Sequence, residues 1–106
     1  MTTTHYGDLE VRVLPTNAEA GAAAAEAFAV AVNEALATRE EIAVILATGN
    51  SQLSFIEAAT ARDDIDWSRI TVLHMDEYLG MSADHPASFR RWMRENVADK
   101  VDLKAL

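Results

Sequence analysis

Three short runs of apolar residues along the chain predict β-strands. Residues 9–14 alternate apolar and polar side chains, which is typical of a strand with one wetter face. Residues 41–47 contain six consecutive apolar positions after a glutamate, a pattern that favours a parallel strand buried on both faces. Residues 70–75 are again mostly apolar and predict a third strand.

Between and after these strands, apolar residues recur at helical spacing. Residues 18–37 combine many alanines with an apolar side chain at every fourth position, which predicts a long helix. Thr16 and Glu19 have the spacing of a capping box at its start. A second helix is predicted over 51–61, and a last one begins at Pro86, because the fixed φ of proline suits the first helical turn.

This alternation of strands and helices predicts an α/β fold. Parallel strands joined by right-handed crossovers give an open, doubly wound (Rossmann-like) sheet with flanking helices, here a single domain over 1–106. Three strands are few for a three-layer sandwich of this kind, and a parallel sheet needs both of its faces covered. We therefore expect an incomplete chain, the N-terminal portion of a larger domain, or one that needs a partner, such as a second copy in a homo-oligomer.

Composition limits the classes of function. The chain has 106 residues, of which 50% are hydrophobic and 25% charged, a balance that is typical of globular proteins. Its net charge of −8 disfavours nucleic acid as a partner, although a few backbone amides can still hold one phosphate. No apolar run is long enough to cross a membrane, and the first residues do not resemble a secretory signal. The absence of cysteine is compatible with a cytoplasmic location.

The first candidate site comes directly after the apolar strand at 41–47. Thr48, Gly49, Asn50 and Ser51 combine hydroxyl groups, a flexible backbone and the first amides of the next helix. Ligands of open α/β sheets bind beyond the carboxyl ends of the strands, and helix N-termini attract anions. The segment therefore predicts a phosphate site. The alternative is an ordinary strand-to-helix turn in which Asn50 or Ser51 caps the helix.

The second candidate site comes directly after the strand at 70–75. Asp76 and Glu77 are adjacent carboxylates, which are costly to bury without partners. Asp76 at a strand end could take a proton from a carbon next to a carbonyl, with His74 on the same side to orient it. The alternative for the two carboxylates is a polar turn that caps the strand, with Tyr78 packed below it. The alternative for His74 is a core histidine whose hydrogen bonds are satisfied.

The remaining polar residues predict less. The histidines have no ligand-like spacing with carboxylates, so we expect no metal site. His5 is assigned no role, and His85 could either cap the last helix or line the cleft. Three arginines on the last helix form a basic face that is either solvated or close to the phosphate; they are Arg90, Arg91 and Arg94.

Taken together, the two candidate segments resemble one known family. They contain ATGNSQLSFIEAA and DWSRITVLHMDEYLGMSADHPASFRRWM, and the most specific part is MDEYLG followed by DHPASF. Over residues 42–97 the chain is similar to the glucosamine-6-phosphate deaminase/isomerase family, whose superfamily includes the 6-phosphogluconolactonases. The preceding strand and helix are compatible with this family without being distinctive.

The resemblance implies a phosphorylated sugar as substrate and a role for each segment. Residues 48–51 fall on the loop that cradles the sugar phosphate, and Asp76 falls on the base for enolisation. Glu77 and Tyr78 match the motif in supporting roles. The implied reaction converts glucosamine 6-phosphate to fructose 6-phosphate and ammonia, and it needs no metal or organic cofactor.

The chain departs from the family pattern in two ways. Asn50, Ser51 and Gln52 stand where the family usually has a small residue, a hydroxyl residue and proline, which bears on sugar specificity. Family members also continue further, with the residues that open the sugar ring in that part. We therefore expect no ammonia release from glucosamine 6-phosphate by the 106-residue chain alone, and measured turnover would contradict this expectation.

Two alternative functions remain at this point. A 6-phosphogluconolactonase would share the phosphate loop but hydrolyse a lactone. That reaction has no obvious need for a carboxylate that acts in enolisation. A non-catalytic domain that binds sugar phosphates would keep residues 48–51 and tolerate the loss of Asp76. Replacing Asp76 with Asn distinguishes these functions, because only enolisation depends on that carboxylate.

Overall fold

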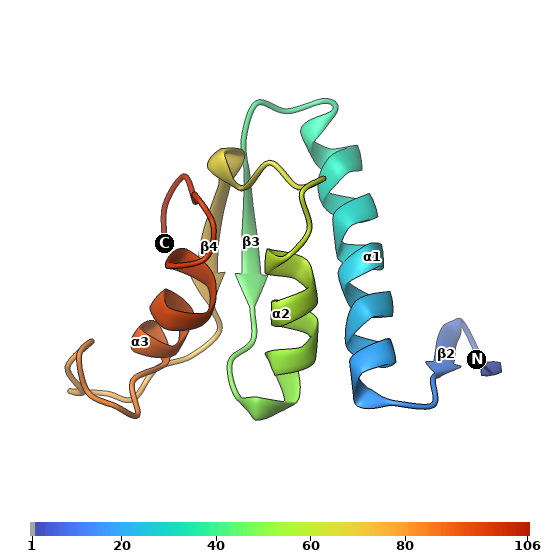
Figure 1. Cartoon of the computed structure of the whole chain (residues 1–106), viewed down its shortest axis with the longest axis horizontal. Coiled ribbons are helices and arrows are strands. Elements are labelled where there is room, and N and C mark those ends of the chain that lie inside the picture. Colours follow the sequence, from blue (N-terminus) through green and yellow to red (C-terminus); the bar gives the residue numbers. More distant parts are fainter. Residues whose placement is uncertain (1) are drawn as a thin grey trace.

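The computed structural model describes residues 2–106, which form two small β-sheets and a group of helices (Figure 1). The elements in chain order are β1 (Thr2–Tyr6), β2 (Leu9–Val13), α1 (Asn17–Leu36), β3 (Ile42–Leu46), α2 (Leu53–Thr60), β4 (Ile70–His74) and α3 (Phe89–Met93). Short turns of 3-10 helix precede α2 and β4, and a wider π-helical turn (Arg94–Ala98) extends α3. The mixed α/β character predicted from the sequence is confirmed.

Helix α1 lies within one residue of its predicted limits and packs along α2 (Figure 1). The Thr16 hydroxyl accepts a hydrogen bond from the Glu19 amide at 3.1 Å, so the predicted N-cap is present. Gly21 allows the close approach of the two helices, because a Cβ at this position would lie 2.5 Å from the carbonyl carbon of Ser54. The small residues of α1 therefore set the distance between the helices.

Strands β3 and β4 form a parallel pair in which Ile42 lies opposite Ile70 and Leu46 lies opposite His74. One face of this pair belongs to the core, where Ile70 and Val72 are fully buried with residues of α2, α3 and the turn after α3. The opposite face is uncovered in the described residues, and Ile45 on it is 64% exposed. The expectation that β3 is buried on both faces is therefore wrong, because the helices cover only one side.

The strand at 9–14 does not join this sheet, contrary to the expected arrangement. Strand β2 pairs instead with β1, which precedes it, in an antiparallel hairpin (Figure 1). Gly7 makes the turn possible with a φ of 62°, a conformation that glycine adopts without strain. The described residues thus contain a two-stranded parallel sheet and a separate hairpin in place of the predicted doubly wound, three-layer sheet.

The end of the described chain returns to the parallel sheet. The Val72 amide donates a hydrogen bond to the Ala105 carbonyl at 3.0 Å, and Thr71 and Ala105 form a parallel bridge. The free edge of β4 is therefore partly covered. Within residues 2–106 there is no helix with the length and hydropathy to cross a membrane.

The last helix begins later than predicted. Pro86 lies in the preceding loop, and α3 starts at Phe89 with Ser88 as its N-cap. The Ser88 hydroxyl accepts a hydrogen bond from the Arg91 amide at 3.4 Å, and Ser88 is only 1% exposed. Serine is a favoured N-cap residue, and Pro86 lies outside the helix, two residues before this cap.

Candidate functional site

The two predicted segments meet at the carboxyl ends of β3 and β4. These strands run parallel, so the residues after them emerge at the same edge of the sheet. A cavity of about 280 Å³ opens there; it is lined by Ala47, Thr48, Gly49, Met75, Asp76 and Phe89. The arrangement brings the predicted phosphate loop and the predicted proton-transfer residue to one place.

Gly49 gives the first segment its shape. It has φ 105° and ψ 170°, a region of backbone conformation that is nearly restricted to glycine. Its carbonyl accepts a hydrogen bond from the Gln52 amide at 3.1 Å, so the chain turns at once into the short helix before α2. Neither that turn nor α2 has a side-chain N-cap in the described part of the chain. The alternative in which Asn50 or Ser51 caps the helix is therefore not found.

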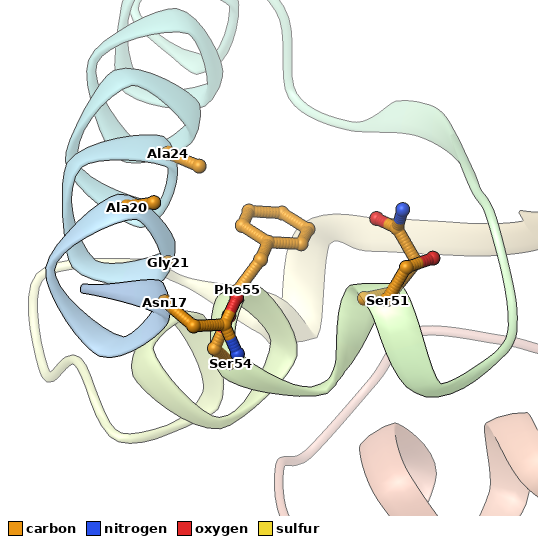
Figure 2. A pocket seen from close by; sticks show the side chains of 8 residues that line it. Asn17, Ala20, Gly21, Ala24, Ser51, Ser54 and Phe55 are labelled. Carbon is orange, nitrogen blue, oxygen red and sulfur yellow. The ribbon is translucent and has the colours of Figure 1, made fainter. Parts of the chain in front are cut away.

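The predicted phosphate loop faces two different cavities. Thr48 and Gly49 line the cavity that contains Asp76. Asn50 and Ser51 are exposed, and Ser51 lines a second cavity of about 380 Å³ between α2 and the start of α1. In Figure 2 the ring of Phe55 lies between Ser51 and helix α1. The structure thus places Thr48 and Gly49 in the cavity with Asp76, Ser51 in the second cavity, and Asn50 in the lining of neither.

Asp76 is exposed at the mouth of the first cavity. Within residues 2–106 its carboxylate forms no hydrogen bond or ion pair, and it remains accessible to a ligand. His74 is half-buried at the end of β4 and is not one of the residues that line the cavity. The geometry therefore brings Asp76 to the site without showing His74 in contact with it.

The carboxylate of Glu77 turns away from the cavity toward the start of α3. Its oxygens accept hydrogen bonds from the amides of Tyr78, Phe89 and Arg90, each at 3.0 Å. They also accept one from the Ser88 hydroxyl at 2.7 Å. With the Arg90 Nε at 3.4 Å, five donors converge on one carboxylate, which ties the loop after β4 to the first turn of α3.

These contacts change the acidity of Glu77. The Phe89 amide contributes most, and together with Ser88, Arg90 and Tyr78 it holds the pKa of the Glu77 carboxyl far below its ordinary value of 4.5, although burial opposes the shift. Glu77 therefore stays ionised at neutral pH and already has its hydrogen-bonding capacity filled. Such a carboxylate is suited to holding structure rather than to exchanging a proton.

Phe89 is the residue of the site that the sequence did not identify. It lines the same cavity as Thr48, Gly49 and Asp76, and the centre of its ring lies 5.0 Å from that of Tyr78. Tyr78 is itself 52% exposed, so it does not pack into the core as the alternative supposed. The signal for Phe89 was its place at the end of DHPASF, a segment that the sequence analysis used for the family resemblance and for the start of a helix but not for the site.

The three arginines of the last helix pair with neighbouring carboxylates and do not line the cavity. Arg90 contacts Glu77 at 3.4 Å, Arg91 pairs with Glu95 at 2.7 Å, and Arg94 pairs with Asp84 at 3.3 Å. They form the solvated face that was one of the two expectations.

The other residues considered as candidates also lie apart from the cavity. The His85 ring accepts a hydrogen bond from the Ala87 amide at 3.0 Å, which holds the loop before α3. His5 lies on the hairpin, 3.8 Å from Glu10. Within residues 2–106 there is no group of three histidine or acidic side chains that could hold a metal ion.

Comparison with known proteins finds the same family that the sequence resembles. Residues 15–105 match the family described as glucosamine-6-phosphate isomerases/6-phosphogluconolactonase. The chain is 36% identical to a glucosamine-6-phosphate deaminase of Arthrobacter sp. (strain FB24) over 99 residues, which cover 90% of this chain and 36% of that protein. It is 40% identical over 65 residues to a glucosamine-6-phosphate deaminase of Exiguobacterium sibiricum, covering 61% of this chain and 25% of that one.

Solved structures share the fold. A monomeric glucosamine-6-phosphate deaminase superposes with a TM-score of 0.73 at 22% identity, over 88% of this chain and 37% of that chain. A 6-phosphogluconolactonase from Shewanella baltica gives a TM-score of 0.75 at 24% identity, over 88% of this chain and 41% of that one. The matches thus span between a quarter and about two fifths of the length of these relatives. It belongs to the family of glucosamine-6-phosphate isomerases and 6-phosphogluconolactonases.

Proposed function

We propose that this chain provides the phosphate-holding and proton-transferring parts of a sugar-phosphate isomerase/deaminase site for glucosamine 6-phosphate. The observation that carries the proposal is the shared cavity at the edge of the parallel sheet, which Thr48, Gly49 and Asp76 line together. Family membership supports a sugar phosphate as the ligand, and the 36% identity to a deaminase favours amino-sugar chemistry over lactone hydrolysis.

The phosphate is held by backbone geometry in this proposal. The turn at Gly49 leaves the first amides of the following helix without side-chain caps, and Thr48 adds a hydroxyl. Unpaired amides at a helix start bind anions through direct hydrogen bonds and through the partial positive charge of the helix end. A site of this kind can hold one phosphate on a chain with a net charge of −8.

Asp76 is the base of the proposed reaction. In the open-chain sugar, its carboxylate takes the proton from C2, which carries the amine, and the electron pair of the C–H bond forms an enol with the C1 aldehyde. Return of the proton to C1 converts the amine at C2 into an imine, and addition of water to that imine releases ammonia and leaves fructose 6-phosphate. General base catalysis of this kind contributes about 10²–10⁴-fold to a rate.

A partial reaction tests the proposal without requiring the ring-opening step. Open-chain fructose 6-phosphate exists in solution, and enolisation by Asp76 would exchange its C1 proton with solvent. We expect the chain to incorporate deuterium from D₂O into C1, which proton NMR of the sugar detects. Replacing Asp76 with Asn should lower this rate about 10²-fold or more. Glucosamine 6-phosphate should still shift the amide signal of Gly49 in the variant.

The matched control is Asp84→Asn, which removes an exposed carboxylate from the same loop but outside the cavity. It should exchange deuterium like the unaltered chain. Equal rates in the Asp76→Asn variant would show that Asp76 is not the base. If the chain hydrolyses 6-phosphogluconolactone and Asp76→Asn leaves that rate unchanged, the chain belongs to the lactonase branch instead. Binding without either reaction would favour a domain that only binds sugar phosphates.

A further inference from the structure

Glu77 connects two residues that line the cavity, Asp76 and Phe89. It is next to Asp76 in the chain, and its carboxylate accepts hydrogen bonds from the amides of Phe89 and Arg90. Phe89 lines the same cavity as Asp76. Two lining residues, one of which carries the accessible carboxylate, are therefore joined through a single side chain.

We propose that Glu77 is a positioning residue that fixes Asp76 relative to Phe89 and the bound sugar. The inference rests on the function proposed above, because it assigns Glu77 a task in that same reaction. Glu77 itself does not line the cavity, so it acts through the backbone of Asp76 and through the first turn of α3. It is distinct from a second acid or base, since both of its oxygens are occupied by donors.

The other contacts of the loop are mostly exposed to solvent. Residues 82–87 form short-range hydrogen bonds within the loop, and Asp84 accepts hydrogen bonds from the exposed side chains of Arg91 at 2.8 Å and Arg94 at 3.3 Å. Ser88 is the exception, because it is buried and its hydroxyl donates to Glu77 at 2.7 Å while it caps α3. The low pKa of Glu77, caused first by the Phe89 amide, shows that the contacts favour the charged carboxylate. Loss of that charge should therefore loosen the connection.

Two substitutions test the role. Glu77→Gln keeps the size of the side chain, but its NH₂ group then faces amide donors that need an acceptor. Ser88→Ala removes one donor and leaves the Glu77 charge and the backbone amides in place. The matched control is Glu95→Gln, which neutralises a carboxylate on the same helical segment that pairs with Arg91 and lies outside the cavity.

The readouts are deuterium incorporation into fructose 6-phosphate and amide hydrogen exchange of Phe89 and Arg90. Misplacing a reacting group by about 1 Å can cost about a hundredfold in rate. We expect Glu77→Gln to lower kcat about tenfold to a hundredfold with KM changed less than about threefold, because the phosphate loop is untouched. Ser88→Ala should show a smaller loss of kcat, and Glu95→Gln none.

The outcomes separate the two proposals. The contact is purely structural if kcat is unchanged in Glu77→Gln and Ser88→Ala while the amides of Phe89 and Arg90 exchange faster. That result would overturn the positioning role but not the proposed function. If Glu77→Gln does not fold, unchanged kcat in Ser88→Ala decides against the role by itself. No deuterium incorporation by the unaltered chain would overturn the proposed function, and the positioning role with it.

Discussion

Gly49 has a backbone conformation that other residues rarely adopt, and the phosphate loop depends on it. At φ 105° an alanine would be strained even though a Cβ would meet no atom within 4 Å. Strain in this region costs about 1–3 kcal/mol. We expect Gly49→Ala to lose stability and to weaken binding of glucosamine 6-phosphate at least about tenfold, since the turn that presents the amides must change. Thermal unfolding and an NMR titration measure the two effects.

Gly7 provides the control for this prediction. It also has a positive φ, 62°, but it lies in the hairpin turn, away from the cavity. Gly7→Ala should therefore lose stability locally and bind the sugar phosphate normally. Equal loss of binding in both variants would mean that strain acts through global unfolding, and the role of Gly49 in presenting amides would be rejected.

Glu77 makes stability depend on pH in a defined direction. Its pKa in the folded chain lies far below its ordinary value of 4.5, so the folded state binds this proton less readily than the unfolded state does. Its contribution to stability is complete above about pH 4.5 and is lost progressively as the pH falls below that value. Urea unfolding between pH 7 and pH 3 should show a smaller acid loss in Glu77→Gln than in the unaltered chain. Parallel curves would contradict the prediction.

At the residue scale, the sequence identified the positions directly after the strands but not the side chains that reach the site from further along the chain. Thr48, Gly49 and Asp76 could be predicted because the carboxyl end of a parallel strand is where ligands bind. Phe89 reaches the same cavity only through folding of the loop between β4 and α3, which no periodic pattern describes. Apart from Tyr78, the partners of Glu77 are 11 to 13 residues away in the chain and could not be predicted for the same reason. The catalytic and binding roles themselves stay predictions.

At the scale of elements, Gly21 controls how closely α1 and α2 pack. In a solvated helix, alanine is favoured over glycine by about 1 kcal/mol. Here its Cβ would lie 2.5 Å from the backbone of Ser54, and overpacking costs about 1–3 kcal/mol. We expect Gly21→Ala to lower the free energy of unfolding, as measured in urea. The control is Ala22→Gly at the exposed neighbouring position, which measures the effect of helix propensity alone. A higher free energy of unfolding in Gly21→Ala would show that the helices can move apart.

The sheet of β3 and β4 should respond differently on its two faces. Ile70 is completely buried, whereas Ile45 on the partner strand is 64% exposed. Truncating a buried isoleucine to alanine costs about 2–5 kcal/mol, so Ile70→Ala should destabilise the chain strongly. Ile45→Ala should cost less than about 1 kcal/mol, mainly through strand propensity. Similar losses in thermal unfolding would show that something covers the Ile45 face in solution.

Local patterns predicted most elements but not their partners. The capping spacing of Thr16 and Glu19 located α1, and the apolar runs located β3 and β4. An apolar run cannot show whether one face or two are covered, which is why Ile45 was expected in a core. The hairpin was missed although residues 9–14 were predicted as a strand, because its partner β1 is a polar segment without an apolar pattern.

At the scale of the whole molecule, the described chain divides into an α/β body and the hairpin. The body contains the core, which runs from α1 through β3 and β4 to the turn after α3. The hairpin stands beside the start of α1 in Figure 1, and its residues are exposed except for the half-buried Val11. Apolar side chains remain uncovered on the hairpin and on the open face of the sheet; the largest include Tyr6, Leu9, Ile45 and Met75. A partner or second copy over these surfaces stays a prediction.

This division predicts two levels of hydrogen-exchange protection. A two-stranded hairpin without a core is marginally stable in water, whereas amides of core strands open only with the whole fold. We expect the ladder amides of β1 and β2 to exchange near the rate of an unfolded chain, while the Val72 amide, bonded to Ala105, exchanges far more slowly. Amide exchange followed by NMR at several protein concentrations measures both. Hairpin protection that rose with concentration would instead show that a second copy pairs with the hairpin, because only association makes local stability depend on concentration.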